Sequence, residues 1–311
     1  MKVLLFTHKI DIDGMGSAIL SKLAFQNVNY VLCETFEINK EVSKYYDNGE
    51  IYSYDYIFVT DICIKEPLLS IINNDTKLKN KVYIFDHHIT EIKENNNKYD
   101  WVNITVDNEI GKCCGTSLFY KYLLDNNYLN SSQAINEFVE LTRRYDTWEW
   151  KEIYSDEKSN ELNTLFNVLG NHSYINYLVR KLEKQDKFSF SDVELDLINN
   201  FKMKTLDKVN TFISNMVIKD IDGYKVGITF VEDEYRNDVA LKLQDSKTDI
   251  DLVMMILLTR GTISYRCIKK EVDVGAFAMT FGGKGHKAAS SSPILTETKE
   301  AVINIILDGK K

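Results

Sequence analysis

Val82-Tyr83-Ile84-Phe85-Asp86-His87-His88 is a short apolar run that ends in one acid and two imidazoles. Four consecutive apolar residues of β-branched and aromatic type predict a buried strand. In open α/β sheets, ligands and metal ions bind at the edge where the strands end. Three polar residues after a strand can equally form an ordinary turn. The stretch therefore predicts a metal or ligand site only if other segments supply matching side chains.

Similar apolar runs recur through the first half of the chain and alternate with helix-like segments. Such alternation predicts a mostly parallel, doubly wound α/β sheet with helices on both faces. The predicted strands are Lys2–Phe6, Val28–Cys33, Tyr56–Thr60 and Val82–Phe85, with Trp101–Val106 as a candidate fifth. The predicted helices are Gly14–Phe25, Asn39–Tyr46, Glu66–Asn73, Gly115–Leu124 and Ser131–Arg144.

The second half of the chain divides into a helical part and a smaller α/β part. Strand signals fade after Lys151, and the sequence predicts helices at Glu161–Leu169, Tyr174–Glu183 and Asp192–Ser214. Strands return at Lys225–Val231, Asp251–Leu258 and Thr262–Ile268, with helices at Asp238–Gln244, Val272–Phe281 and Thr298–Leu307. We therefore predict three parts: a catalytic domain at 1–150, a helical connector at 151–215 and a C-terminal domain at 216–311.

Composition excludes several classes of protein. The chain has 311 residues, 44% of them hydrophobic and 27% charged, which is typical of a globular protein. A net charge of −8 argues against binding to duplex DNA, which requires a basic face. No apolar run approaches the roughly 20 residues that span a bilayer, so no membrane contact is expected. Five cysteines without a CxxC motif indicate reduced packing residues of a cytoplasmic protein.

Acids and imidazoles occupy equivalent places in other segments. His8, Asp11 and Asp13 follow the first strand, Asp61 follows the third strand, and Asp146 ends a helical run. Each has an ordinary alternative, namely a loop, a helix-capping acid or a solvated turn. Calcium is disfavoured because the EF-hand ligand spacing is absent. Together the mixed donors suit Mn²⁺, Mg²⁺, Fe²⁺ or Co²⁺ better than structural zinc.

The C-terminal part has a glycine-rich stretch at 278–290, which includes Gly282, Gly283, Gly285 and His286. Glycines in this spacing let backbone N–H groups converge on an anion, although a helix C-cap followed by a turn is the simpler interpretation. Arg266, in the preceding strand, either binds a phosphate or is an ordinary surface arginine. The helix start at 111–117 could direct N–H groups at an anion, but a well-capped helix is the simpler interpretation. The aromatic residues Tyr145, Trp148 and Trp150 could stack a base, but packing at the edge of the core is the simpler interpretation.

The ordered set His8-x-x-Asp11-x-Asp13-Gly14, Asp61, Asp86-His87-His88 and Asp146 resembles the DHH phosphoesterase superfamily. The resemblance covers nearly the whole chain and implies a metal-dependent phosphoester hydrolase. It implies that His8 and Asp11 bind one metal, that Asp61 bridges two, and that Asp13, His87 and Asp146 complete the second. His88 would stabilise the substrate phosphate, and Asp86 would orient an imidazole. Two divalent ions are implied, with Mn²⁺ preferred and Mg²⁺ or Co²⁺ as alternatives.

The C-terminal stretch resembles the GGGH-type loop of the DHH-associated substrate domain. This resemblance implies that Arg266, Gly282, Gly283, Gly285 and His286 bind substrate. Lys284 interrupts the glycines and Ser290 stands where glycine is frequent, so the shape of the loop is left open. Family II pyrophosphatases carry Lys/Arg pairs in place of such a loop, which makes pyrophosphate a weaker candidate.

The domain plan and the segment Arg144–Trp148 are similar to those of oligoribonucleases of the B type, also called nanoRNases. The resemblance implies an exonuclease that hydrolyses short RNA or linear dinucleotides such as pGpG to mononucleotides, as a monomer or homodimer. Cyclic mono- or dinucleotides and 3′-phosphoadenosine phosphate are alternative substrates. An inactive, nucleotide-sensing protein is a further alternative, but none of the six implied metal ligands is missing.

Overall fold

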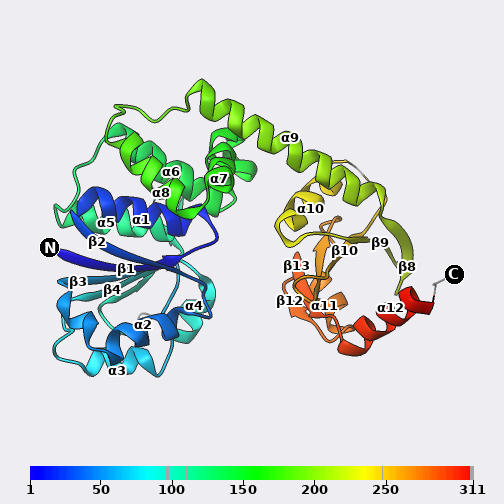
Figure 1. Cartoon of the computed structure of the whole chain (residues 1–311), viewed down its shortest axis with the longest axis horizontal. Helices are drawn as coiled ribbons and strands as arrows, with labels where there is room; N and C mark the ends of the chain where they lie inside the picture. Colours follow the sequence, from blue (N-terminus) through cyan, green and yellow to red (C-terminus); the bar gives the residue numbers. More distant parts are fainter. Residues whose placement is uncertain (96–97, 110, 247, 309–311) are drawn as a thin grey trace. The chain divides into compact units, whose positions relative to one another are not determined.

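The computed structural model describes residues 1–95, 98–109, 111–246 and 248–308 of the chain. The chain divides into two compact units, Met1–Asn199 and Asn200–Lys311 (Figure 1). The helical segment after residue 151 packs on the first unit as far as its boundary. None of the helices within the described ranges is both long and apolar enough to cross a bilayer.

The first unit is built on a five-stranded sheet in the order β2-β1-β3-β4-β5, and every pair of neighbouring strands is parallel. This confirms the predicted parallel α/β architecture. Because all five strands run the same way, their carboxyl ends meet at one edge of the sheet. The strands are β1 (Lys2–His8), β2 (Asn27–Cys33), β3 (Tyr56–Thr60), β4 (Val82–Asp86) and β5 (Val102–Ile104).

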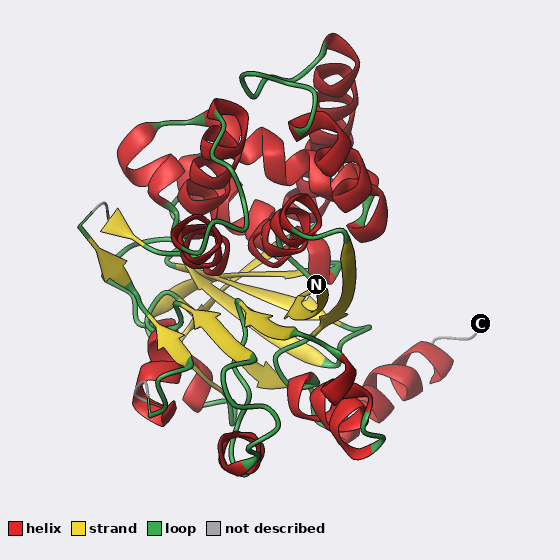
Figure 2. Cartoon of the chain, turned by 90° about the vertical axis from the view of Figure 1, so that its left-hand side faces the viewer, coloured by secondary structure: helices red, strands yellow, loops and turns green. Residues whose placement is uncertain are grey.

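Helices cover both faces of this sheet (Figures 1 and 2). Alternate residues of one strand enter different cores: Phe58 packs in the core beneath α1 and α5, whereas Val59 packs in the core beneath α2 and α3. A strand that is buried on both faces needs continuous apolar sequence, which explains the unbroken runs that identified the strands. The helices are α1 (Ile12–Ala24), α2 (Ile38–Asp47), α3 (Leu68–Asn74), α4 (Ile89–Asn95) and α5 (Gly115–Asp125).

The helical segment that follows extends the first of these cores. Ser132 caps α6, because its side chain accepts a hydrogen bond from the backbone N–H of Ile135. Leu165 and Tyr174 are buried in the same core as residues of α1 and α5. The helices are α6 (Gln133–Asp146), the short η2 (Trp150–Tyr154), α7 (Glu157–Leu169), α8 (Asn171–Leu182) and α9 (Asp192–Ser214).

The second unit contains a six-stranded mixed sheet in the order β12-β13-β11-β10-β9-β8, in which only β9 and β10 are parallel. Its strands are β8 (Val217–Ile221), β9 (Tyr224–Phe230), β10 (Leu252–Leu257), β11 (Thr262–Cys267), β12 (Lys284–Gly285) and β13 (Ala289–Pro293). Its helices are α10 (Arg236–Asp245), α11 (Val274–Met279) and α12 (Thr296–Asp308). The shorter elements of the chain are η1 (Glu50–Ser53), β6 (Asp107–Asn108), β7 (Gly111–Lys112) and η3 (Asp233–Tyr235).

Sequence reasoning missed three strands of this sheet, namely β8, β13 and the two-residue β12. β8 lies at the edge of the sheet and is almost wholly exposed, so it has no apolar alternation. β13 reads Ala-Ser-Ser-Ser-Pro, which has little intrinsic preference for a strand, and it forms by antiparallel pairing with β11. All five cysteines are free thiols, and four of them are buried.

Candidate metal centre

The predicted ligands of the first unit gather where β1, β3 and β4 end. His8 is the last residue of β1, Asp61 follows β3 directly, and Asp86 is the last residue of β4. The three strands are neighbours in the sheet, so their ends lie side by side. Asp11 is the N-cap of α1, Asp13 lies in its first turn, His87 directly follows β4, and Asp146 ends α6.

One set of donors consists of His8, Asp11 and Asp61, whose ligand atoms all lie within 4.8 Å of one another. Nδ1 of His8 is 2.6 Å from Oδ2 of Asp11 and 3.5 Å from Oδ2 of Asp61. Asp11 also caps α1 by accepting a hydrogen bond from the N–H of Gly14 through its other oxygen. One imidazole and two carboxylates in this arrangement can supply part of the coordination shell of one cation.

A second set consists of Asp13, His87 and Asp146, again within 4.8 Å. Nε2 of His87 lies 3.3 Å from Oδ2 of Asp146 and 3.8 Å from Oδ2 of Asp13. The same nitrogen is 3.4 Å from Oδ1 of Asp61. The two oxygens of Asp61 therefore approach the two donor sets separately, one His8 and the other His87.

Three atoms of the two donor sets have no hydrogen-bond partner within the described part of the chain. Asp61 Oδ2, His87 Nε2 and Asp146 Oδ2 are buried and unpartnered. A buried polar atom without a partner costs free energy, so such groups normally contact water, an ion or a ligand. Asp61 is moreover left-handed, with φ 60°, a conformation that non-glycine residues rarely adopt outside functional sites. The donors present fit a pair of divalent cations.

The electrostatics of the cluster also favour bound cations. Burial, together with the negative charges of Asp11 and Asp13, raises the pKa of Asp61 well above its ordinary range. Burial and the charge of Asp13 raise the pKa of Asp146 to about 7. Burial opposes protonation of His8, but its hydrogen bond to Asp11 and the nearby negative charge of Asp61 outweigh burial and raise the pKa of His8 to about 10. Buried carboxylates that oppose one another's ionisation in this way favour a bound divalent cation, which would balance their charge.

Asp13 is held in place by the start of the neighbouring helix α5. Its two carboxylate oxygens accept hydrogen bonds from the N–H groups of Gly115 and Thr116, each 2.7 Å long. These N–H groups begin α5, so the anion at this helix start is a side chain of the protein itself. Gly115 also lies against the backbone of Asp61: a Cβ atom there would be 2.8 Å from the N atom of Asp61. Sequence reasoning did not identify either role.

Asp86 and His88 form a pair that adjoins both donor sets, since their ligand atoms also lie within 4.8 Å of those of Asp61 and His87. Oδ1 of Asp86 lies 2.7 Å from Nδ1 of His88 and accepts hydrogen bonds from the backbone N–H groups of His87 and His88. The hydrogen bond to Asp86 raises the pKa of His88 despite partial burial. Asp86 is buried, whereas the His88 side chain is half exposed. The imidazole that Asp86 orients is therefore that of His88.

One further carboxylate was not predicted. Glu34 follows β2, and its Oε2 lies 3.9 Å from Nε2 of His8, the ring nitrogen that does not face Asp11. Histidines that bind metals commonly direct their second nitrogen toward a carboxylate. Glu34 directly follows its strand, as Asp61 does, and this position is the sequence signal that could have identified it.

The predicted substrate residues of the second unit lie near one another within that unit. Arg266 in β11 pairs with Ala289 in β13, and Ala289 lies three residues after His286. Its guanidinium donates to Ser264, to the carbonyl of Tyr265 and to Asn237. Burial and the nearby charge of Arg236 lower the pKa of Arg266 to about 10. A guanidinium beside a second cation is a favourable place for an anion.

The glycine-rich loop differs from its expected form. The N–H of Gly282 donates to Met279 and the N–H of Gly283 donates to Ala278, so both groups cap the end of α11. For these two N–H groups the structure has the helix cap, which was the simpler of the two interpretations. The N–H of His286 donates to Ala289 in the hairpin that contains Gly285, whereas the His286 side chain is exposed. Binding of substrate by this loop stays a prediction.

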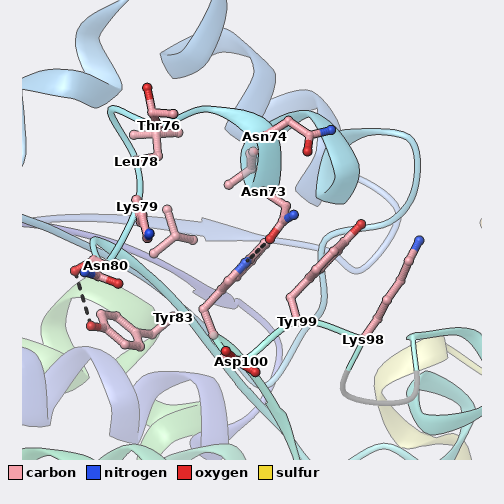
Figure 3. A pocket seen from close by; sticks show the side chains of 13 residues that line it. Asn73, Asn74, Thr76, Leu78, Lys79, Asn80, Tyr83, Lys98, Tyr99 and Asp100 are labelled. Carbon is pink, nitrogen blue, oxygen red and sulfur yellow. Dashed lines mark hydrogen bonds between the residues drawn. The ribbon is translucent and has the colours of Figure 1, made fainter.

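A hollow of about 600 Å³ lies at the opposite edge of the first sheet, where β4 and β5 begin (Figure 3). Several of its polar side chains satisfy one another: Trp101 donates to Asn73, and the hydroxyl of Tyr83 donates to the carbonyl of Asn80. Among the described residues that line it, Asp100 is the only acid and none is a histidine. The hollow therefore does not offer the donors of a catalytic metal site.

The model of the DHH family N-terminal domain matches residues 2–142, which hold every donor described above except Asp146. The chain is also similar to the Oligoribonuclease NrnB of Bacillus subtilis (strain 168). The two are 29% identical over 302 residues, which are 96% of this chain and 74% of that protein.

Two solved structures share the fold. The pGpG-specific phosphodiesterase PggH from Vibrio cholerae aligns with a TM-score of 0.52 at 13% identity, over 99% of this chain and 98% of its own. A structure of the exonuclease RecJ bound to manganese aligns with a TM-score of 0.59 at 14% identity, over 97% of this chain and 88% of its own. At these identities the likeness shows the fold alone.

Proposed function

This chain belongs to the DHH family of phosphoesterases, and from that premise we propose that it hydrolyses short oligoribonucleotides to mononucleotides. Linear dinucleotides such as pGpG are included in the proposed substrates. Two similar proteins support this choice, because one is named as an oligoribonuclease and the other as a pGpG-specific phosphodiesterase. The net charge of −8 supports small substrates over long polyanions.

The observation that carries the proposal is the position of Asp61 between two sets of donors. Its oxygens approach His8 on one side and His87 on the other, at 3.5 and 3.4 Å. A carboxylate shared by two cations is the usual arrangement of sites that hydrolyse phosphate esters with two metals. We assign His8 and Asp11 to one cation, Asp13, His87 and Asp146 to the other, and Asp61 to both.

We propose Mn²⁺ as the metal, with Mg²⁺ or Co²⁺ able to replace it. Mixed carboxylate and imidazole donors suit these ions, and the related RecJ structure was solved with manganese. When bound, such ions lower the pKa of a water molecule and offset charge on a phosphoryl group.

The protein's own residues would orient the substrate and stabilise its charge. With Nδ1 of His88 fixed on Asp86, Nε2 is the nitrogen free to donate to a phosphoryl oxygen. The raised pKa of His88 favours the protonated, donating form. Arg266 and the loop of Gly282, Gly283, Gly285 and His286 are assigned to a phosphate or nucleotide of the substrate, with Arg266 and His286 supplying the charge and the donors.

The test is a comparison of initial rates with Mn²⁺ on five substrates. The panel holds pGpG, a five-nucleotide RNA, a cyclic mononucleotide, 3′-phosphoadenosine phosphate and pyrophosphate. The two linear oligoribonucleotides should be hydrolysed fastest, and a chelator should abolish the activity until Mn²⁺ is restored. Fastest cleavage of any of the other three compounds would contradict the proposed substrate but retain the phosphoesterase. No hydrolysis of any compound would contradict both.

A further inference from the structure

Trp148 combines two features that do not stabilise a fold. Its backbone is left-handed, with φ 63°, and its side chain is 44% exposed. A bulky residue in this conformation is an outlier, because its Cβ approaches the neighbouring carbonyl. Exposure of a large indole adds nothing to the core. Trp148 also stands two residues after Asp146, so the Cα atoms of the two are at most about 7.6 Å apart.

The residues on either side of Trp148 are firmly held. Thr147 donates to the carbonyl of Arg143 through both its backbone N–H and its hydroxyl, at 3.0 and 2.8 Å. Glu149 is buried and accepts a 2.6 Å hydrogen bond from the guanidinium of Arg143, which is buried too. The side chains of Thr147 and Glu149 are thus fixed inward, and that of Trp148 is directed outward.

Behind Trp148 lies a series of aromatic rings. The indole of Trp148 stacks on that of the buried Trp150, with centroids 6.3 Å apart and planes at 29°. Trp150 in turn stacks on Tyr145, with centroids 6.0 Å apart and planes at 17°. Tyr145 directly precedes Asp146. The series of rings therefore begins with the residue that precedes a proposed metal ligand and ends with an exposed aromatic ring.

We propose that Trp148 is the stacking platform for the nucleobase next to the scissile phosphate. This inference rests on the proposed function and adds a base subsite to it. A rigid indole accepts any planar base on its face, so the subsite would favour nucleotides over bare phosphate esters without choosing among bases. Trp148 touches the base and not the reacting atoms, so it positions the substrate.

The first test compares two substrates in the presence of Mn²⁺: pGpG and a 5′-phosphorylated dinucleotide analogue that lacks both bases. Trp148→Ala should raise KM for pGpG about ten-fold or more, because stacking on one aromatic residue contributes that much. Trp148→Phe, which keeps an aromatic face, should stay within about three-fold of the wild type. Neither variant should change KM for the abasic analogue. Equal losses on both substrates would mean a structural role and contradict the subsite.

The second test does not depend on turnover. Titration with the mononucleotide 5′-GMP should quench the tryptophan fluorescence of the wild type, and Trp148→Phe should lose most of that quenching. Trp101→Phe is the matched control, because Trp101 lies at the opposite edge of the sheet, and it should retain the quenching. A wild type that hydrolyses no nucleotide but is quenched at Trp148 would contradict the proposed function alone. Hydrolysis of pGpG with an unchanged KM in Trp148→Ala would contradict the subsite alone.

Discussion

Oδ1 of Asp86 lies 2.7 Å from Nδ1 of His88, and Asp86 is completely buried beneath that half-exposed imidazole. The carboxylate fixes the orientation of the ring and favours its charged form. Asp86→Asn should therefore lower kcat about 10- to 100-fold while leaving the affinity for Mn²⁺ nearly unchanged. His88→Gln should lower kcat by a similar factor or more.

Steady-state kinetics together with calorimetric titration of Mn²⁺ would check this pair. His172→Gln is the control, because His172 lies in α8 and contacts Tyr30. If His88→Gln lost metal in place of turnover, His88 would be a ligand and the proposed division between His87 and His88 would be wrong.

Asp61 should affect stability and activity in opposite directions. Asp61→Asn removes a buried carboxyl group whose ionisation the neighbouring carboxylates oppose, so it should raise the free energy of unfolding of the metal-free protein, by about 1 kcal/mol or more. The same change should lower hydrolysis at least about 1000-fold, because the shared ligand is lost. Denaturation in a chelator and initial rates with Mn²⁺ measure the two effects.

The same denaturation series has a built-in comparison. Adding Mn²⁺ should raise the melting temperature of the wild type, because the cations bind only the folded state. In Asp61→Asn this rise should be much smaller. An equal rise in both proteins would remove Asp61 from the metal site.

Arg266 should act on substrate binding alone. Arg266→Gln removes a partly buried guanidinium that has no acidic partner among the described residues, and it should raise KM about 10- to 100-fold. Affinity for Mn²⁺ should not change. Arg260→Gln is the matched control, since Arg260 is exposed and paired with Asp233. A KM that is equally affected in both variants would indicate a general effect of surface charge.

A buried ion pair should give the first unit a defined acid sensitivity. Nζ of Lys181 lies 2.5 Å from Oε2 of Glu194, and the backbone N–H and hydroxyl of Ser191 donate to the same oxygen. Burial opposes ionisation of Glu194, but these hydrogen bonds outweigh it and lower its pKa. A lowered pKa adds stability above the ordinary glutamate value of about 4.3, and this stability is lost as the pH falls further.

Glu194→Gln should therefore lower the free energy of unfolding at pH 7 by about 3 kcal/mol, because Lys181 is left buried without its partner. The loss should shrink below about pH 4, where the wild type also loses the interaction. Urea denaturation at both pH values measures it. Glu183→Gln, at the exposed end of α8, is the control and should change stability little. A loss that is the same at pH 7 and pH 3.5 would contradict the assignment of the pKa.

Much of the fold could be predicted from local sequence pattern. β3 and α9 have the predicted bounds, because apolar runs and helical periodicity are properties of neighbouring residues. β13 could not be predicted, because its serines form a strand only through pairing with β11. The glycines after α11 were consistent with two uses, and hydrogen bonds to Ala278 and Met279 decide for the helix cap.

By itself, the sequence determined the parallel sheet and the set of acids and imidazoles at its carboxyl edge, because strand ends and donor types can be read from neighbouring residues. Only the tertiary structure decided how these donors divide around Asp61 and which groups support them. Asp13 is held by Gly115, 102 residues away, and by Thr116 beside it. Contacts between residues so distant in the chain leave no periodic trace in the sequence, because they arise only when separate elements pack together.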